Sequence, residues 1–306
     1  MTRSRSARAL MLAAGVTPLL IGFYAVAQPW YLDWGATTAE LSRTLPGDEI
    51  IPDARSQHTR AITINVPVER VWPWLAQLGQ DRGGFYSFDV LENVVGCRMP
   101  VEDYLRPDKQ SWAIGDKLWM YPPDRAGGVG FATLRVLVPS RALGFATRST
   151  GTSLDEPEDG SWSMVLEPID GGSTRLLIRG RLAKGRSALG AAFDASVFAP
   201  MHYVMERRMM IGIRQLAEGS SRERMLNHAH VLLWTVTFVL FLVAGWRVLH
   251  GNETIRSLMA FVAGGAVFQV LTFLQPSILV GETLVVLLLA LPWWPLRSHA
   301  RTRIEG

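Results

Sequence analysis

Cysteine is almost absent from this sequence, because Cys97 is the only one in 306 residues. A single thiol cannot form a disulfide within the chain, and it cannot build a metal centre from several thiolates. The six histidines add no metal signal, since His228 and His230 sit beside a hydrophobic segment and the others are isolated. We therefore predict no metal and no cofactor.

Familiar catalytic motifs are also missing. The sequence contains no G-x-S-x-G, no G-x-x-x-x-G-K, no H-E-x-x-H and no G-x-G-x-x-G after a strand. Their absence excludes the usual hydrolase, kinase and dehydrogenase interpretations. Acid/base chemistry in a cavity needs none of these motifs, so it stays open.

Lysine is rare, since only Lys109, Lys117 and Lys184 occur and arginine supplies the other cations. The formal net charge is +4, and the cations are scattered through predicted strands and tails. A nucleic-acid interface would need them clustered on one face. We predict no nucleic-acid partner, and the sequence leaves protein partners unknown.

Hydrophobic residues make up 48% of the chain and gather at its two ends. The run Leu10–Val26 has arginines before it and Trp30, Tyr31 and Trp34 after it, which is typical of a membrane-spanning helix. A cleaved signal peptide is the alternative, because Ala25-Val26-Ala27 fits a small-x-small cleavage pattern.

Three further apolar segments follow near the other end, namely Val231–Trp246, Leu258–Leu274 and Ile278–Leu296. They bring the expected number of membrane helices to about four. Most flanking arginines would be cytoplasmic if both termini are inside, although Arg222 and Arg224 favour the opposite orientation. We predict a multi-pass cell-membrane protein with its soluble domain outside the cytoplasm.

The chain is thus expected to have four parts. Residues 1–35 hold the first membrane helix and its flank, and residues 36–59 form a polar linker rich in turn signals. Residues 60–218 form a soluble ligand-binding domain, and residues 219–306 hold three membrane helices and a basic tail.

Short strands and two main helices are predicted within residues 60–218. Ile62, Ile64 and Val66 alternate with other residues as in a half-buried strand, and Pro67 suits the start of a helix that Pro73 should bend or divide. Later strands are predicted at Asp116–Tyr121, Phe131–Val138, Leu143–Arg148, Trp162–Pro168 and Thr174–Leu182, before a long helix at Phe198–Glu218. In the last strand, arginines alternate with apolar residues, which predicts one face on a core and the other in water.

The stretch RAITINVPVERVWPWLAQLGQDRGGFYSFDVLENVVG, with LPGDEIIPD before it and MHYVMERRMMIGI after it, resembles the START-like (SRPBCC) superfamily. More narrowly, it resembles a bacterial branch that is labelled polyketide cyclase/dehydrase and lipid-transport-like. The resemblance covers Leu45 to Glu218 and leaves out the membrane segments. It implies an α+β helix-grip fold, in which an antiparallel sheet wraps a long C-terminal helix and leaves a cavity. That superfamily holds binders, carriers and a few enzymes, so the resemblance says little about activity.

Two sets of residues are candidates for a site. Met201, Met205 and Met209 share one face of the long helix and, with Trp72, would line the cavity, although plain core packing is the alternative. The polar set lies on the Gly-rich loop Gly79–Asn93 and would be at the cavity mouth; it consists of Arg82, Tyr86, Asp89, Glu92 and Asn93.

The polar loop residues have two interpretations. Arg82, Tyr86, Asp89 or Glu92 could orient or protonate a substrate, or an ion pair from Arg82 or Arg98 to a loop carboxylate could pin the loop. His202 and Glu206, one helical turn apart, could likewise form an acid/base pair or a surface or loop-anchoring contact.

The leading hypothesis is a membrane-anchored domain that binds a hydrophobic or amphipathic small molecule, such as a lipid, without transforming it. The alternatives are a cyclase or dehydratase acting on polyketide-like substrates, and a sensor or assembly module whose membrane helices carry the function.

Overall fold

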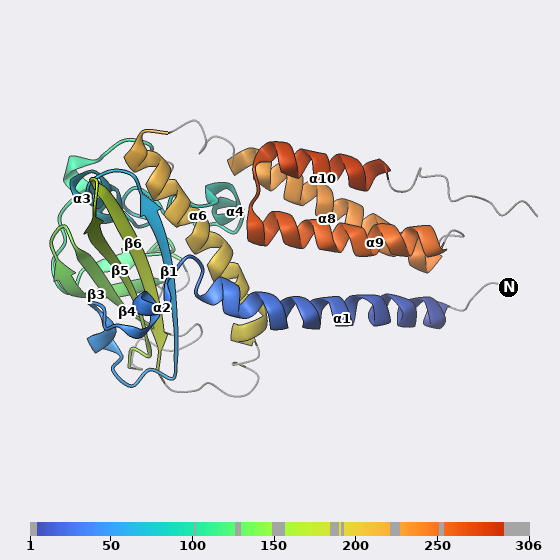
Figure 1. The fold of residues 1–306 in the computed structure, drawn as a ribbon, viewed down its shortest axis with the longest axis horizontal. Helices are drawn as coiled ribbons and strands as arrows, with labels where there is room; N and C mark the ends of the chain where they lie inside the picture. Colours follow the sequence, from blue (N-terminus) through green and yellow to red (C-terminus); the bar gives the residue numbers. More distant parts are fainter. Residues whose placement is uncertain are drawn as a thin grey trace, which may run out of the picture. The chain divides into compact units, whose positions relative to one another are not determined.

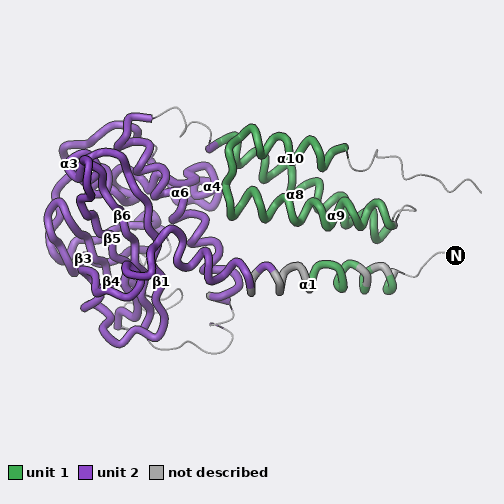
Figure 2. The backbone as a smooth tube through the Cα atoms, viewed as in Figure 1, with its two compact units in different colours: residues 1–22, 228–306 green, residues 23–227 purple. Residues whose placement is uncertain are grey.

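A computed structural model describes residues 5–100, 102–125, 130–148, 157–183, 190, 193–220, 227–250 and 254–290. The chain divides into two compact units (Figure 2). One is Phe23–Asn227, called the domain below, and the other combines Met1–Gly22 with His228–Gly306.

The domain is built on one antiparallel sheet of six strands, ordered β1-β6-β5-β4-β3-β2 (Figure 1). The strands are β1 (Ser56–Ile64), β2 (Lys117–Trp119), β3 (Phe131–Val138), β4 (Ala142–Thr147), β5 (Gly160–Ile169) and β6 (Ser173–Leu182). Each predicted strand is present and pairs antiparallel with its neighbours. Asp170, Gly171 and Gly172 connect β5 to β6, and both glycines adopt the positive φ that such a turn requires.

The domain's helices are α2 (Thr38–Ser42), η1 (Asp48–Ile50), α3 (Val68–Ala76), α4 (Asp89–Val94), η2 (Pro107–Lys109), the π-helical turn η4 (Asp194–Phe198) and α6 (Ala199–Glu218). Pro67 caps the start of α3, and Pro73 lies inside that helix. The long helix α6 lies across one face of the sheet (Figure 1). The predicted α+β class, with an antiparallel sheet and a long C-terminal helix, is confirmed.

The core lies between this face of the sheet and α6. Alternate strand residues point into it, including Ile62, Ile64, Met164, Leu176 and Ile178. From α6 the core takes Met209, Met210, Ile213 and Leu216. Burial of such side chains stabilises the fold by roughly 1.5–3 kcal/mol each.

A glycine lets the loop before α4 approach α6 closely. A Cβ atom at Gly212 would overlap the backbone oxygen of Tyr86, so only glycine fits there. Tyr86 itself has a φ of 55°, a left-handed conformation that is uncommon outside glycine. The contact fixes this loop against the middle of α6.

Residues 36–59 are folded onto the sheet, so the predicted linker is corrected. The stretch contains α2, η1 and the start of β1, and Leu45 and Asp48 in it are buried. Arg179 of β6 holds it in place by donating to the Asp48 carboxylate at 2.8 Å and to the Glu40 carbonyl at 2.6 Å. We call residues 36–55 the strap.

The arginine face of β6 is covered and does not meet water as predicted. Arg179 is only 2% exposed, and its Nε also donates to Thr59 Oγ1 at 2.9 Å. Arg175 pairs with Glu40 at 2.8 Å. The alternation was identified correctly, but strap carbonyls and carboxylates satisfy these guanidinium groups in place of solvent.

The other unit contains most of α1 (Arg5–Leu32) and α8 (Asn227–His250), together with α9 (Thr254–Gln269), η5 (Val270–Leu274) and α10 (Ile278–Ala290). Among the described residues, two helical stretches are long and apolar enough to cross a membrane, Asn227–His250 and Ile255–Leu274. The prediction of about four spans is corrected to these two.

The other two predicted spans, Leu10–Val26 and Ile278–Leu296, are not among these stretches. The run Leu10–Val26 lies within α1, while α10 is shorter than a span and residues 291–296 of its predicted segment fall outside the described residues. Gly264 and Gly265 both lie against Phe241 of α8, where small residues let helices pack closely.

Candidate functional site

A buried polar cluster lies between the first turns of α6 and the sheet. Its centre is Glu206, which accepts from Arg60 Nη1 at 2.7 Å and from Trp162 Nε1 at 2.7 Å. The side chains of Arg60 and Glu206 are each only 1% exposed. His58 and His202 complete the group, which we call the polar cluster.

Strand register brings the cluster together. In β1, His58 and Arg60 continue the alternation of Ile62 and Ile64, so they point toward α6 as well. His58 pairs with Gly180 of β6, and Gly180 pairs with Trp162 of β5, so the three form one row across the sheet. A Cβ atom at Gly180 would overlap the His58 ring, so this glycine provides the space that the imidazole occupies.

His58, Arg60 and Trp162 were not predicted from the sequence as site residues. The period-two pattern that predicts β1 extends back through both His58 and Arg60, and that was the available signal. The charge and polarity of these two side chains favour an exposed position, because buried charges are rare unless they are paired. The partner of Arg60 lies 146 residues away in the sequence.

The three ionisable partners around Arg60 have perturbed pKa values. Burial would raise the pKa of Glu206, but Arg60, helped by His202 and His58, lowers it below its ordinary value. Burial and the Arg60 charge lower the pKa of His58 to about 3, and burial lowers the pKa of His202. Near neutral pH both imidazoles are therefore uncharged, and Glu206 and Arg60 form an ion pair whose net charge is zero.

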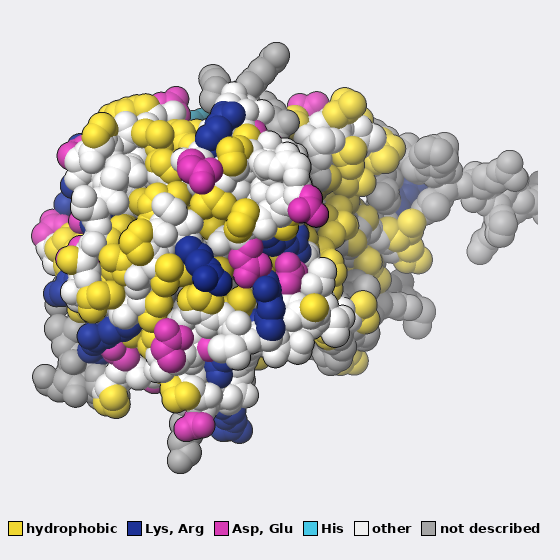
Figure 3. All heavy atoms as spheres, turned by 60° about the vertical axis from the view of Figure 1, so that its left-hand side comes forward, with side chains coloured by type: hydrophobic (Ala, Val, Ile, Leu, Met, Phe, Trp, Pro, Cys, Tyr) yellow, Lys and Arg dark blue, Asp and Glu magenta, His cyan; other side chains and the backbone are white. Residues whose placement is uncertain are grey.

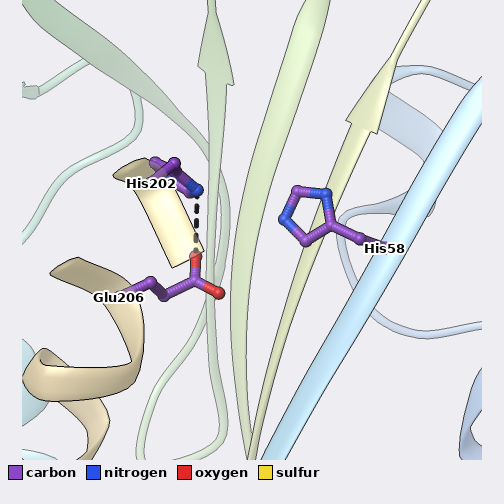
Figure 4. A group of neighbouring side chains, drawn as sticks. All are labelled: His58, His202 and Glu206. Carbon is purple, nitrogen blue, oxygen red and sulfur yellow. Dashed lines mark ion pairs between the residues drawn. The ribbon is translucent and has the colours of Figure 1, made fainter. Parts of the chain in front are cut away.

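Figure 4 shows His58, His202 and Glu206 converging in the space between α6 and β1. His202 and Glu206 come from successive turns of α6, with His202 Nδ1 3.9 Å from Glu206 Oε2. The His58 ring faces them, with its centroid 6.0 Å from that of His202. His202 also stacks on Phe198, which leaves it as the half-exposed edge of the cluster.

His202 and Glu206 thus lie close together, while their role as an acid/base pair stays a prediction, and the alternative of a surface contact is wrong for Glu206. The helix turns this carboxylate toward the sheet, where Arg60 and Trp162 satisfy both of its oxygens. A carboxylate so held is a structural anchor for α6. It also lies beside two neutral imidazoles that can act as bases or as ligands.

The predicted methionine stripe does not share one environment. Met201 is 57% exposed, Met205 is half-buried, and Met209 is packed in the core. The Met205 carbonyl accepts from Ser87 Oγ at 2.9 Å, which faces that turn toward the loop before α4. Trp72 packs at the edge of the core from α3. The cavity that these residues would line stays a prediction.

The α4 residues of the polar set lie away from the polar cluster, whereas Tyr86 packs in the same core as Met209. Asp89, Glu92 and Asn93 lie on α4, as the predicted helical turn required, and α6 lies between α4 and the sheet (Figure 1). Tyr86 is buried and meets Trp74 edge-on at 6.0 Å. The side chain of Asn93 bonds both backbone groups of Met99, so it anchors the following loop.

The expected ion pairs of Arg82 and Arg98 with α4 are corrected. Arg82 donates to the carbonyls of Lys109 and Ser111 and lies over the Trp112 ring at 3.7 Å. Arg98 pairs with Asp124 at 2.9 Å. Arg82 is thus held by two carbonyl groups and an aromatic ring, and Arg98 by a carboxylate outside α4.

Glu92 carries a pKa raised to about 7, first by burial and then by the charge of Asp89. Its folded pKa exceeds the ordinary 4.5, so the stability that neutral Glu92 contributes is complete below pH 4.5 and is lost as pH rises through 7. The free energy of unfolding of the wild type should therefore fall by about 2 kcal/mol from pH 5 to pH 8 because of Glu92. Glu92→Gln has no carboxyl group at this position, so it should lack this fall.

Urea unfolding of the wild type and Glu92→Gln at both pH values measures this difference, with the exposed Glu69→Gln as control. Equal pH dependence in the wild type and Glu92→Gln would contradict the assigned burial of Glu92.

Comparisons with known proteins supply the remaining observations. No family model matches the sequence, and no curated protein matches it. A solved protein from Mesorhizobium loti is 15% identical over 54% of this chain and 98% of its own, with a TM-score of 0.31. A polyketide-cyclase-like protein from Corynebacterium glutamicum is 16% identical over 57% and 94%, with a TM-score of 0.25. The Zhui aromatase/cyclase from a Streptomyces species is 15% identical over 56% and 95%, with a TM-score of 0.27.

At such identities and TM-scores the likeness carries nothing about what this chain binds or does. Its function has to be inferred from its own side chains.

Proposed function

We propose that the domain binds a hydrophobic or amphipathic small molecule, such as a lipid, at the start of α6, without obligatory chemistry. The observation that carries the proposal is the group of exposed apolar side chains around His202, the half-exposed edge of the polar cluster. An apolar rim beside a few convergent polar groups is the usual composition of a small-molecule site.

The rim is formed by η4, the first turn of α6 and the end of α1. Phe193, Val197, Phe198 and Met201 are all exposed, and Phe198 lies against the His202 ring. Trp30 is 40% exposed and meets Tyr203 of α6 edge-on at 5.6 Å. Large apolar side chains gathered on a surface mark a ligand, partner or membrane site more often than chance exposure does.

The chemistry of the polar cluster limits which head group the ligand can have. Its cation, Arg60, is already paired with Glu206 and is out of reach of solvent. A carboxylate or phosphate head group would therefore gain no free positive charge there. The neutral imidazole of His202 can still donate or accept one hydrogen bond, which suits an uncharged polar head on an apolar body.

The two membrane-length stretches, Asn227–His250 and Ile255–Leu274, would hold this site at a bilayer from which such a ligand is taken. The arginine distribution favours a multi-pass arrangement with the domain outside the cytoplasm. Charge on the domain surface fits a small-molecule partner better than nucleic acid. Acidic and basic side chains are intermixed on the face drawn in Figure 3. Arg43–Glu167 and Arg135–Glu158 are two of the ion pairs of the domain.

Native mass spectrometry of the full chain, purified in dodecyl maltoside and exchanged repeatedly into fresh detergent, tests the proposal. We expect the wild type to retain one small molecule per chain, and Phe198→Asp to lose it because a charge would stand in the apolar rim. Ile114→Asp is the matched control, since Ile114 is an exposed apolar residue elsewhere on the domain. Absence of a bound mass from the wild type, or equal retention by both variants, would overturn the proposal.

One observation favours an enzyme as the second candidate. A carboxyl group whose pKa lies near 7, as that of Glu92 does, is suited to general acid/base work. A cyclase or dehydratase would use Glu92 with Asp89, Tyr86 or Arg82. Glu92→Gln separates the two functions, because an enzyme would lose turnover while keeping its ligand, whereas a pure binder with its site at the start of α6 would keep its affinity.

A further inference from the structure

We propose that His58, His202 and Glu206 form a binding site for a divalent transition-metal ion of the Zn²⁺ type. Two imidazoles and one carboxylate are a donor set that such ions favour. The site goes beyond the lipid-like ligand proposed above and shares His202 with it; Zn²⁺ binding is measured without that ligand, so the two proposals are tested separately. The metal site also departs from the expectation of no metal, which rested on the scatter of histidines along the sequence.

The geometry places three donors around one point. His202 and Glu206 lie one helical turn apart on α6, and His58 reaches across from β1 (Figure 4). One ligand atom from each lies within 4.8 Å of the others. In a tetrahedral site with bond lengths near 2.0–2.2 Å, the ligand atoms lie about 3.3 Å from one another. Side-chain rotations that move each ligand atom by about an ångström would therefore close the site.

The donor atoms are prepared to bind. His58 Nε2 is buried, and it has no hydrogen-bond partner. A buried nitrogen left in this way normally costs about 1–3 kcal/mol, and a metal bond would remove that cost. Gly180 keeps the space for the ring open, since any side chain at that position would overlap it.

The surroundings fix the carboxylate ligand. Arg60 and Trp162 each donate to Glu206 at 2.7 Å, which is how outer partners usually orient a metal-binding carboxylate. Phe198 packs flat against His202, with ring centroids 5.6 Å apart, and holds that ring from the opposite side. Such support is worth roughly 10–100-fold in metal affinity at known sites.

The same surroundings select the ion. The charge of Arg60 opposes any cation, so only an ion with strong bonds to imidazole overcomes it. Mg²⁺ and Ca²⁺ need several oxygen ligands, and the cluster offers a single carboxylate. Zn²⁺, Co²⁺, Ni²⁺ and Cu²⁺ accept nitrogen donors. Three protein ligands would leave a fourth position for water or another small donor.

Calorimetric titration of the untagged, chelator-treated full chain with ZnCl₂ tests the site, and the visible spectrum after CoCl₂ addition reports the coordination geometry. We expect one ion per chain and a tetrahedral Co²⁺ spectrum. His58→Ala and His202→Ala should each weaken Zn²⁺ binding at least tenfold and abolish that spectrum. His250→Ala, an exposed histidine of α8, should leave both unchanged.

His58→Gln guards against loss of folding, because it keeps the size of the side chain and leaves Arg60, Trp162 and Glu206 paired. With metal removed, its thermal melting should match that of the wild type, while its Zn²⁺ affinity should fall as in His58→Ala. The proposal is overturned if the wild type binds no ion in a one-to-one ratio. It is also overturned if both His58 variants bind as the wild type does, or if His250→Ala removes the binding.

Discussion

Replacing Arg60 with methionine is expected to lower the free energy of unfolding of the domain by about 3–5 kcal/mol. The change leaves the Glu206 carboxylate buried with Trp162 as its remaining direct donor. An ionised carboxylate without a counter-charge is costly in the interior, so the loss should exceed that of most single substitutions. Urea unfolding of the full chain, followed by tryptophan fluorescence, measures it.

Two further variants make the result specific to burial. Arg43→Ala breaks the exposed Arg43–Glu167 pair, which should cost only about 0–1 kcal/mol. The double variant Arg60→Met, Glu206→Met replaces the whole ion pair with apolar groups and should recover much of the loss. An Arg60→Met effect no larger than that of Arg43→Ala, or a double variant worse than the single one, would show that the pair does not anchor α6.

Replacing Arg179 with methionine should release the strap, at a cost of about 2–4 kcal/mol. The substitution removes the donors to the carbonyls of Glu40 and Arg43 and to the Asp48 carboxylate. Asp48 keeps a weaker contact with Arg181 at 3.3 Å, so the loss should be smaller than for Arg60. Limited proteolysis with trypsin reads out the release, because Arg43 and Arg55 within the strap should be cut faster.

Arg141→Met is the matched control, since Arg141 is an exposed arginine on the turn between β3 and β4. It should change neither stability nor the rate of cleavage in the strap. Cleavage of Arg179→Met at the wild-type rate would show that other contacts hold residues 36–55 on the sheet.

Local patterns were sufficient to predict the elements of the domain. Alternation of apolar residues identified β1 and β6, and Pro67 marked the start of α3. These features depend on side chains within a few residues of one another, where backbone sterics and the strand period act directly. The α+β class followed from them.

The site could not be predicted in the same way. The cluster depends on strand register and on how α6 is rotated, which bring His58 and Arg60 of β1 to Glu206 far along the chain. The same rotation separated Met201 from Met209 and put α4 on the side of α6 away from the sheet. Helical spacing alone gives a face, but it does not say what that face meets.

From residue order alone, this chain is an α+β domain with strongly apolar segments at both ends, because composition and short-range periodicity are properties of neighbouring residues. Tertiary structure decided which polar residues are buried together, that a supposed linker is a strap, and that two stretches have the length and apolarity of a span. In a sequence, a charged residue is normally predicted to be exposed. Charged side chains become core residues only when a distant partner such as Glu206 or Asp48 satisfies them in the folded state.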